Sequence, residues 1–122
     1  MSEVRFDFRD KVVIVTGVGR VGQIGHAAAS AFGAAGARLV LCDLNAVAVA
    51  ERAREFEAAG IAARPAAGDL TEPDVAQFAV QTALEQFGRL DTVVNIAGGL
   101  TTYGPIERTT LKDFDRELAI NL

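Results

Sequence analysis

A short apolar run that leads directly into a glycine-rich segment is the feature that most restricts how this chain can fold. Val12–Thr16 is apolar up to its final threonine, as in strands that are buried on both faces. The next residues read Gly-Val-Gly-Arg-Val-Gly-Gln-Ile-Gly, and small residues continue with helical spacing from Ile24 to Ala35. The segment therefore predicts a sharp turn from a buried strand into a helix.

The glycines of this turn have the spacing of a phosphate-binding site. The spacing GxGxxG is followed by a fourth glycine, and it lies between a buried strand and a helix, which strengthens an otherwise weak motif. A helix N-terminus presents backbone N–H groups to an anion if no Cβ blocks its approach. We predict a dinucleotide site that includes Gly17, Gly19, Arg20, Gly22, Ile24 and Gly25, with the pyrophosphate on the N-terminus of the helix. A purely structural glycine turn is the alternative.

Three further strand patterns follow, and each precedes a helix pattern. The strand patterns are Arg38–Cys42, Ile61–Ala66 and Leu90–Ile96, and the helix patterns run from Ala46 to about Ala59, from the region of Pro73 to Gly88, and onward from Leu111. Right-handed connections place such units in a parallel sheet covered on both faces. The sequence therefore predicts an α/β fold in one domain over residues 1–122, a Rossmann-type doubly wound sheet with strand order 3-2-1-4.

Polar residues mark where the helices begin. Asn45 can cap the second helix, and Thr71 with Asp74, and Thr110 with Asp113, have the spacing of capping boxes for the third and fourth helices. The charged residues of the second helix predict a solvated face, made of Glu51, Arg52, Arg54, Glu55 and Glu57.

An acidic residue ends the second strand pattern. Asp43, followed by Leu44, stands where a carboxylate accepts hydrogen bonds from the adenosine ribose hydroxyls and repels a 2′-phosphate. This favours NAD as the cofactor. Arg20 favours NADP, since an arginine in the turn can pair with a 2′-phosphate. We predict NAD over NADP, while Asp43 can also serve the backbone at the start of the second helix.

Composition excludes several classes of partner. The net charge is −4, with 16 acidic and 12 basic residues, so binding to nucleic acid or to an anionic membrane surface is not expected. The single cysteine, Cys42, rules out an internal disulfide, and with His26 on a different element it indicates no metal site. No apolar run approaches the roughly 20 residues of a membrane span. We expect a soluble cytoplasmic protein.

Four motifs in order resemble the short-chain dehydrogenase/reductase family. They are the Thr16-Gly17 opening of the turn, Gly68-Asp69-Leu70 after the third strand, Asn95-Ile96-Ala97-Gly98 after the fourth, and Ala119-Ile120-Asn121-Leu122. The resemblance begins at about Arg9. It implies cofactor contacts at Asp69, Leu70, Asn95, Ala97 and Gly98, and a catalytic role for Asn121. It also implies hydride transfer between a nicotinamide and a small alcohol or carbonyl substrate.

Two departures from the family pattern concern the cofactor site. The family turn reads Thr-Gly-x-x-x-Gly-x-Gly, whereas the turn here is two residues longer and has Gln23 where a middle glycine is expected. Gly22 can take the middle role. Ile96 replaces the second Asn of the Asn-Asn-Ala-Gly motif.

The 122 residues contain little of the family's reaction chemistry. The family uses a Ser and a Tyr-x-x-x-Lys pair, but Tyr103 is the only tyrosine and Glu107 lies four residues later. The final helix pattern also ends on apolar residues without a stop signal. We therefore expect a domain that is incomplete at its C-terminus, inactive alone, with an uncovered fourth strand that favours self-association into a homo-oligomer.

Two other functions remain open. One is a nucleotide-binding module or pseudoenzyme without catalysis. The other is a divergent enoyl-thioester reductase, because that branch of the family also has altered glycine turns. Thr101, Thr102 and Tyr103 are expected either to line a substrate pocket or to form a plain surface loop.

Overall fold

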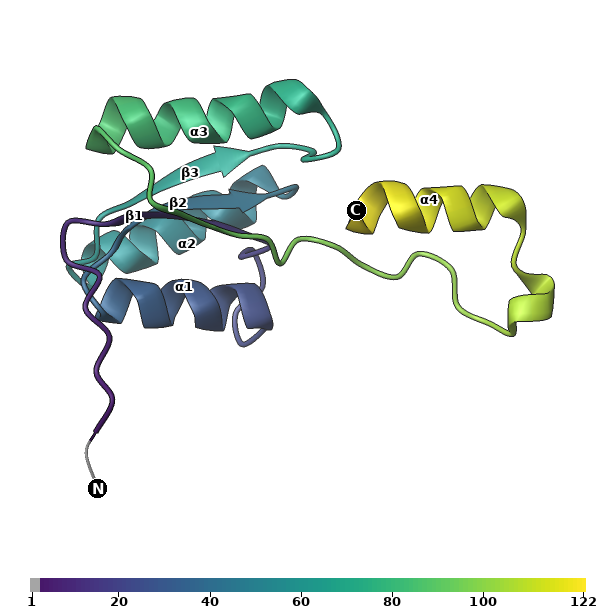
Figure 1. Ribbon diagram of the computed structural model, residues 1–122, viewed down its shortest axis with the longest axis horizontal. Coiled ribbons are helices and arrows are strands. Elements are labelled where there is room, and N and C mark those ends of the chain that lie inside the picture. The colour runs from purple at the N-terminus through teal and green to yellow at the C-terminus, as the bar shows by residue number, and fades with distance from the viewer. Residues whose placement is uncertain (1–2) are drawn as a thin grey trace.

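The computed structural model describes residues 3–122 and contains one parallel sheet with helices on both of its faces (Figure 1). The strands are β1 (Val12–Thr16), β2 (Arg38–Asp43), β3 (Ala63–Ala67) and β4 (Thr92–Val94). The helices are α1 (Ile24–Ala34), α2 (Ala46–Ala58), α3 (Pro73–Phe87) and α4 (Leu111–Asn121), with a 3₁₀ turn η1 at Ile106–Arg108. The strand order is β3-β2-β1-β4, which confirms the Rossmann-type topology predicted from the alternating patterns.

The sheet has two hydrophobic cores because successive side chains of a strand point to opposite faces. On one face, α1 and α2 cover a cluster that includes Val13, Val15, Leu39 and Leu41. On the other face, α3 covers a cluster that includes Val12, Ile14, Val40, Cys42 and Ala66. All five residues of β1 are buried, as the continuous apolar run predicted. The sheet centre therefore fixes the carboxyl ends of β1 and β2, where the site lies.

The fourth strand is shorter than its sequence pattern. β4 pairs with β1 only at Thr92–Val94, and the chain beyond it leaves the sheet. β4 is the edge strand of the order β3-β2-β1-β4, and Val93 is 48% exposed. The predicted run to Ile96 was too long because Ile96 and Ala97 use their N–H groups on a side chain of β1 instead of on a strand.

Two predictions about the helices were wrong. Thr71 does not cap α3, because its backbone N–H and its hydroxyl both donate to Asp69 Oδ1, at 2.9 and 2.7 Å. Glu72 is the N-cap and makes no side-chain cap bond. Arg52 is not solvated but 8% exposed, because it shares the buried face of α2 with Val49, Ala53 and Phe56. The caps at Asn45 and at Thr110 with Asp113 are confirmed.

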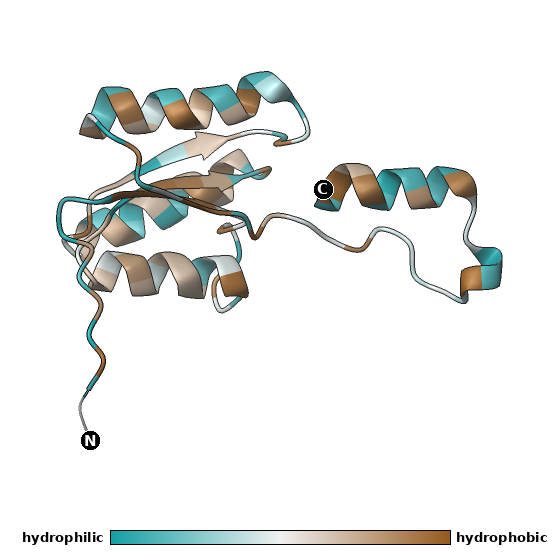
Figure 2. Ribbon diagram, in the orientation of Figure 1, coloured by the Kyte–Doolittle hydropathy of each residue, from teal (hydrophilic) through white to brown (hydrophobic). Residues whose placement is uncertain are grey.

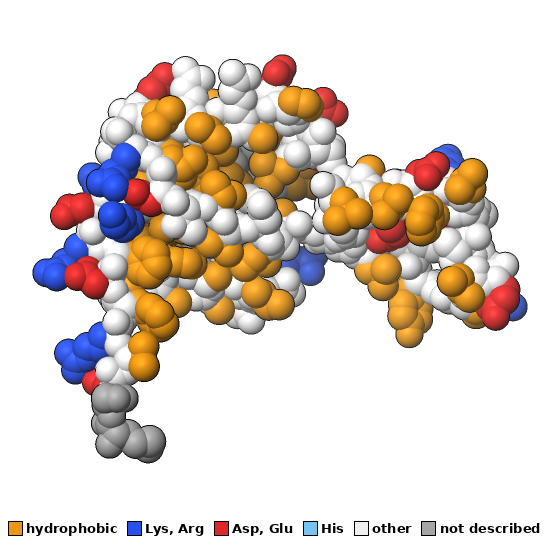
Figure 3. All heavy atoms as spheres, in the orientation of Figure 1, with side chains coloured by type: hydrophobic (Ala, Val, Ile, Leu, Met, Phe, Trp, Pro, Cys, Tyr) orange, Lys and Arg blue, Asp and Glu red, His pale blue; other side chains and the backbone are white. Residues whose placement is uncertain are grey.

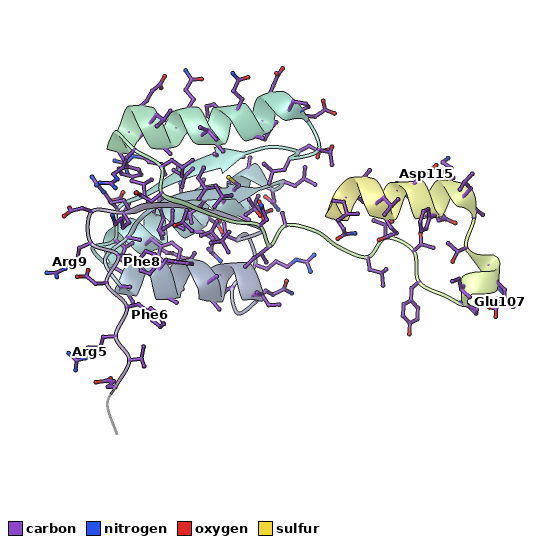
Figure 4. All side chains as sticks on the ribbon, in the orientation of Figure 1. Arg5, Phe6, Phe8, Arg9, Glu107 and Asp115 are labelled. Atoms are coloured by element: carbon purple, nitrogen blue, oxygen red, sulfur yellow. The ribbon has the colours of Figure 1, made fainter. Side chains whose placement is uncertain are left out.

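The helix α4 lies beyond the carboxyl edge of the sheet, apart from the layers formed by α1 to α3 (Figure 1). Hydrophobic residues recur along α4 (Figure 2), and hydrophobic side chains appear on its visible surface (Figure 3). The large exposed ones are Leu111, Phe114 and Leu118 of α4 and Leu122 directly after it. At the opposite side of the molecule, Phe8 of the N-terminal segment packs edge-on against Phe32 of α1, with ring centroids 4.9 Å apart. Figure 4 labels Phe6 and Phe8 on that segment.

Within residues 3–122, no helix combines the length and the apolar character needed to cross a membrane. Over the same residues, no group of three His, Cys, Asp or Glu side chains is placed to hold a metal ion.

Candidate functional site

The glycine turn connects β1 to α1 at the carboxyl edge of the sheet. In the described chain no side chain caps the N-terminus of α1, since the N-cap residue Gln23 makes no such bond. The first turn of a helix has backbone N–H groups without partners inside the helix, and the helix dipole is positive there. The start of α1 therefore has the donors that an anionic group requires.

The glycines of the turn meet different steric demands. A Cβ on Gly25 would lie 2.0 Å from the Gly17 oxygen, so α1 can approach the end of β1 only with glycine at that position. Gly17 has φ +74° and would place a Cβ 2.9 Å from Ala97 N. Gly22 has φ +79° but faces open space. Gly17 and Gly25 therefore permit close packing of backbone against backbone, while Gly22 supplies the left-handed bend of the longer turn.

Asp43 ties the glycine turn to the start of α2. Its Oδ2 accepts a hydrogen bond from Gly19 N at 2.8 Å, and its Oδ1 accepts one from Asn45 N at 3.0 Å. A Cβ on Gly19 would lie 2.8 Å from the same carboxylate. The side chain is partly exposed, so lone pairs remain for hydroxyl donors. The backbone role and the predicted ribose role of Asp43 are therefore compatible.

Thr16 is a site residue that was predicted only as the first residue of the glycine-turn motif. Its Oγ1 accepts hydrogen bonds from Ile96 N and Ala97 N, both at 2.9 Å. Thr16 is 4% exposed, so this hydroxyl replaces strand pairing in a buried place. The signal was a hydroxyl residue at the end of an otherwise aliphatic strand. Through it, β1 fixes the segment from Asn95 to Gly98.

Asp69 and Leu70 follow β3 at the same edge. The hydrogen bonds from the hydroxyl and backbone N–H of Thr71 lower the pKa of Asp69, so this carboxylate is stabilised in its charged form. Leu70 packs against the core on the α3 side. Gly68 N donates to Asp43 O at 3.0 Å, which links the end of β3 to that of β2.

The helix α4 brings Asn121 to Gly99, which directly follows the Asn95–Gly98 segment. Asn121 Nδ2 donates to Gly99 O at 2.9 Å, and its Oδ1 accepts from Gly99 N at 3.0 Å. Gly98 is next to this pair, and a Cβ there would lie 2.6 Å from Asn121 Oδ1. The structure therefore joins the sequence-predicted Asn121 to the predicted Asn95–Gly98 segment.

The remaining sequence-predicted residues lie at the exposed margins of the candidate site. Arg20 is exposed in the glycine turn, and Ile24 and Leu44 are each 74% exposed beside it and beside Asp43. Tyr103 is 94% exposed and lines a small hollow with Thr102, Pro105 and Arg108. Whether this hollow receives a substrate stays a prediction.

His26 and Cys42 have packing roles. His26 Nδ1 accepts from Gly22 N at 3.4 Å, and its ring lies 5.9 Å from that of Phe56. Cys42 is fully buried in β2, and burial raises the pKa of its thiol to about 12, so the reactive thiolate is suppressed.

Comparison with known proteins identifies the family. The model of the short chain dehydrogenase family matches residues 11–122. The chain is 36% identical over 116 residues to a C alpha-dehydrogenase of Sphingobium sp., covering 95% of this chain and 37% of that protein. It is 40% identical over 121 residues to a D-threitol dehydrogenase of Mycolicibacterium smegmatis, covering 98% and 45%. The chain belongs to the short-chain dehydrogenase/reductase family.

Solved structures show the same fold. A 3-ketoacyl-ACP reductase from Sinorhizobium meliloti 1021 has a TM-score of 0.84 and 32% identity, covering 91% of this chain and 43% of that one. A metagenomic short-chain oxidoreductase in complex with NADP has a TM-score of 0.81 and 34% identity, covering 94% and 51%. This chain therefore spans less than half the length of the two curated relatives and about half or less of the two solved chains.

Proposed function

We propose that this chain is the NAD(P)-binding part of an oxidoreductase that transfers hydride between a nicotinamide and an alcohol or carbonyl carbon of a small molecule. The observation that carries the proposal is the position of Asp43, whose carboxylate holds the glycine turn through Gly19 N beside the uncapped start of α1. A pyrophosphate donor set and a ribose acceptor are thereby fixed to each other.

The residues of the turn fit such a cofactor. Gly22 is open to solvent beside the turn, and the donors of the first turn of α1 face no capping side chain in the described chain. When bound, the nicotinamide supplies the hydride acceptor or donor. The protein's own part is to hold the pyrophosphate on α1, the ribose at Asp43 and Leu44, and the adenine beside Asp69 and Leu70.

We favour NAD over NADP. The Asp43 carboxylate would repel a 2′-phosphate, and its hydrogen bonds with two backbone N–H groups keep it at the strand end. Arg20 is the feature that favours NADP, and the metagenomic relative is described in complex with NADP. The preference between NAD and NADP therefore depends on whether the Asp43 carboxylate or the Arg20 guanidinium lies nearer to the ribose.

In the proposed function, Asn121 positions the backbone. Both polar atoms of its amide are used by Gly99, so the side chain holds the backbone after β4 in place. The family's Tyr-x-x-x-Lys pair does not occur in these 122 residues, and the only serines of the sequence, Ser2 and Ser30, lie well before the fourth helix, beyond which the family has its catalytic serine. Catalysis by a protein that carries this chain is proposed to need such residues from elsewhere.

A nucleotide-binding module without catalysis is the second candidate, and the single tyrosine with Glu107 four residues later favours it for these residues taken alone. The test is an assay of hydride transfer, in which the loss of NADH absorbance is measured with ketone substrates and with enoyl-thioester substrates. It is run on the 122-residue chain and on the longest natural protein that contains it. Turnover by the longer protein supports the oxidoreductase. NADH binding without turnover by either supports the module, and turnover of enoyl thioesters only supports the enoyl reductase.

We also propose that the protein self-associates. The exposed apolar residues of α4 and the edge strand β4 support this, since an uncovered edge and an apolar helix face favour contact with another chain.

A further inference from the structure

The segment between β4 and α4 is held by polar side chains of α4. Glu117 Oε1 accepts hydrogen bonds from Thr101 N at 2.7 Å, from Thr101 Oγ1 at 2.5 Å and from Thr102 N at 3.0 Å. One turn later, Asn121 forms its two-way pair with Gly99. A loop without strand or helix is thereby fixed over four residues, 99–102.

The charge of Glu117 is central to this contact. Three donors converge on one carboxylate oxygen, and hydrogen bonds to an ionised acceptor are stronger than neutral ones. These bonds, first that of the Thr101 hydroxyl, lower the pKa of Glu117. Among its neighbours, Arg116 of α4 also lowers that pKa, Asp113 of α4 is acidic, and Tyr103 is the only titratable residue of the loop 98–105.

The face of α4 that contacts the loop is polar. Asp113, Glu117 and Asn121 recur at four-residue spacing and therefore lie on one face of the helix. That face meets the loop, whereas Phe114 and Leu118 remain 54% and 41% exposed. Hydrogen bonds to side chains of α4 therefore position the loop.

The same helix links the loop to the proposed cofactor edge. Asn121 Nδ2 donates to Glu117 O at 2.9 Å and lies 3.5 Å from Glu117 Oε2. Asn121 in turn holds Gly99, which follows the Asn95–Gly98 segment fixed by Thr16. A shift of the Glu117 carboxylate would therefore displace both the loop and the amide of Asn121.

We propose that ionised Glu117 is a positioning residue, which sets the place of the loop 99–102 and the orientation of the Asn121 amide next to the dinucleotide. The effect on the dinucleotide site rests on the proposed function, whereas the contact between Glu117 and the loop can be tested without cofactor or substrate. Loss of the charge frees the loop and leaves the sheet intact.

The test follows the backbone amides of Thr101 and Thr102 by NMR as the pH is lowered through the acidic range. In the wild-type chain both amide protons are expected to shift downfield when Glu117 is ionised and to move with a single shared titration. Glu117→Gln keeps an acceptor oxygen but has no charge, so this titration disappears. Asp115→Asn is the matched control, because Asp115 lies on the same helix and its side chain points away from the loop (Figure 4).

Hydrogen exchange gives the second measurement. Glu117→Ala is expected to speed the exchange of the Thr101 and Thr102 amides about tenfold or more, whereas Glu117→Gln speeds it less and removes its pH dependence. Amides of β1 report whether the variants remain folded. If the two amides do not titrate together in the wild type, or if Asp115→Asn has the same effect as Glu117→Ala, the proposal is overturned.

The cofactor separates this proposal from the proposed function. With NAD⁺ present, the wild type is expected to show shifts at the glycine turn and at Gly99, and Glu117→Ala is expected to lose those at Gly99 and keep those at the turn. Equal shifts at Gly99 in both proteins overturn the positioning role. A wild type that keeps its Glu117 titration but shows no shift with NAD⁺ overturns the proposed function and leaves the contact of Glu117 standing.

Discussion

The carboxylate of Asp43 accepts a hydrogen bond from Gly19 N at 2.8 Å, across 24 positions of the chain. The contact joins the carboxyl end of β2 to the glycine turn after β1, so one acidic side chain both orders the turn and presents charge where a ribose would lie. Because Asp43 also accepts from Asn45 N, the charge is held from two sides.

Asp43→Asn removes this charge and keeps an oxygen that can accept from Gly19 N. We expect the preference for NAD⁺ over NADP⁺ to fall about tenfold, because hydrogen bonds to charged groups contribute roughly 1.5–3 kcal/mol. Arg20→Ala should change the preference in the opposite direction. Titration calorimetry with both cofactors measures the ratio, and an unchanged ratio in Asp43→Asn would assign cofactor choice to other residues.

Thr16→Val tests the hydroxyl that holds the segment after β4. Valine has nearly the same shape but leaves the N–H groups of Ile96 and Ala97 without their acceptor, so we expect a loss of about 1–3 kcal/mol in the free energy of unfolding. Thr16→Ser keeps the oxygen and should retain these bonds. Urea denaturation compares the two, and equal losses would show that methyl packing, not the hydroxyl, is what matters.

Gly25→Ala tests the close approach of α1 to β1. The added Cβ would lie 2.0 Å from Gly17 O, so the backbone must move, at a cost of about 3 kcal/mol or more. Gly99→Ala is the control, because a Cβ there meets nothing within 4 Å, and it should cost less than about 0.5 kcal/mol. Thermal melting that ranks both variants equally would contradict the packing described for the turn.

The pH dependence of the free energy of unfolding should reveal the contribution of Asp91, which directly precedes β4. Asp91 accepts hydrogen bonds from Arg89 and from Val12 N, which lower its pKa below 3.8 in the folded chain. A lowered pKa in the folded state stabilises above the unfolded value, and this contribution is lost as the pH falls through 3.8 toward the folded value.

In Asp91→Asn the melting temperature should therefore fall less steeply below about pH 4 than in the wild type. Near neutral pH the variant should melt at a lower temperature than the wild type. Asp115→Asn, at an exposed position on α4, serves as the control. An acid limb as steep in Asp91→Asn as in the wild type would exclude this role for Asp91.

Self-association should depend on the apolar face of α4. Leu118→Lys places a charge among exposed apolar residues and is expected to shift the chain toward the monomer in multi-angle light scattering. Lys112→Glu, on the same helix, changes charge outside that group and should leave the mass unchanged. A wild type that is already a monomer at high concentration would contradict the proposed homo-oligomer.

Much of the fold follows from local patterns. The continuous apolar run of β1, the alternation with helices and the right-handed crossover rule were enough to predict the sheet order β3-β2-β1-β4. Strand ends were less predictable because hydrophobicity does not show where pairing stops. β4 ends at Val94, since the next N–H groups reach the Thr16 hydroxyl of another strand. Arg52 was misplaced because helical spacing, not charge, decides which side chains face the sheet.

The candidate site was predictable at the level of motifs and not of contacts. The glycine spacing and Asp43 could be recognised, yet the bond between Gly19 and Asp43 depends on how β1 and β2 lie in register. The grip of Glu117 on Thr101 and Thr102 has no sequence signature, because it joins a helix to an irregular loop whose path is set by tertiary structure.

Calorimetric titration of the wild-type chain with NAD⁺ and, separately, NADP⁺ tests whether these residues form a dinucleotide-binding site. We expect saturable binding of one dinucleotide per chain, with NAD⁺ bound more tightly than NADP⁺. A chain that melts cooperatively but binds neither dinucleotide would contradict this expectation.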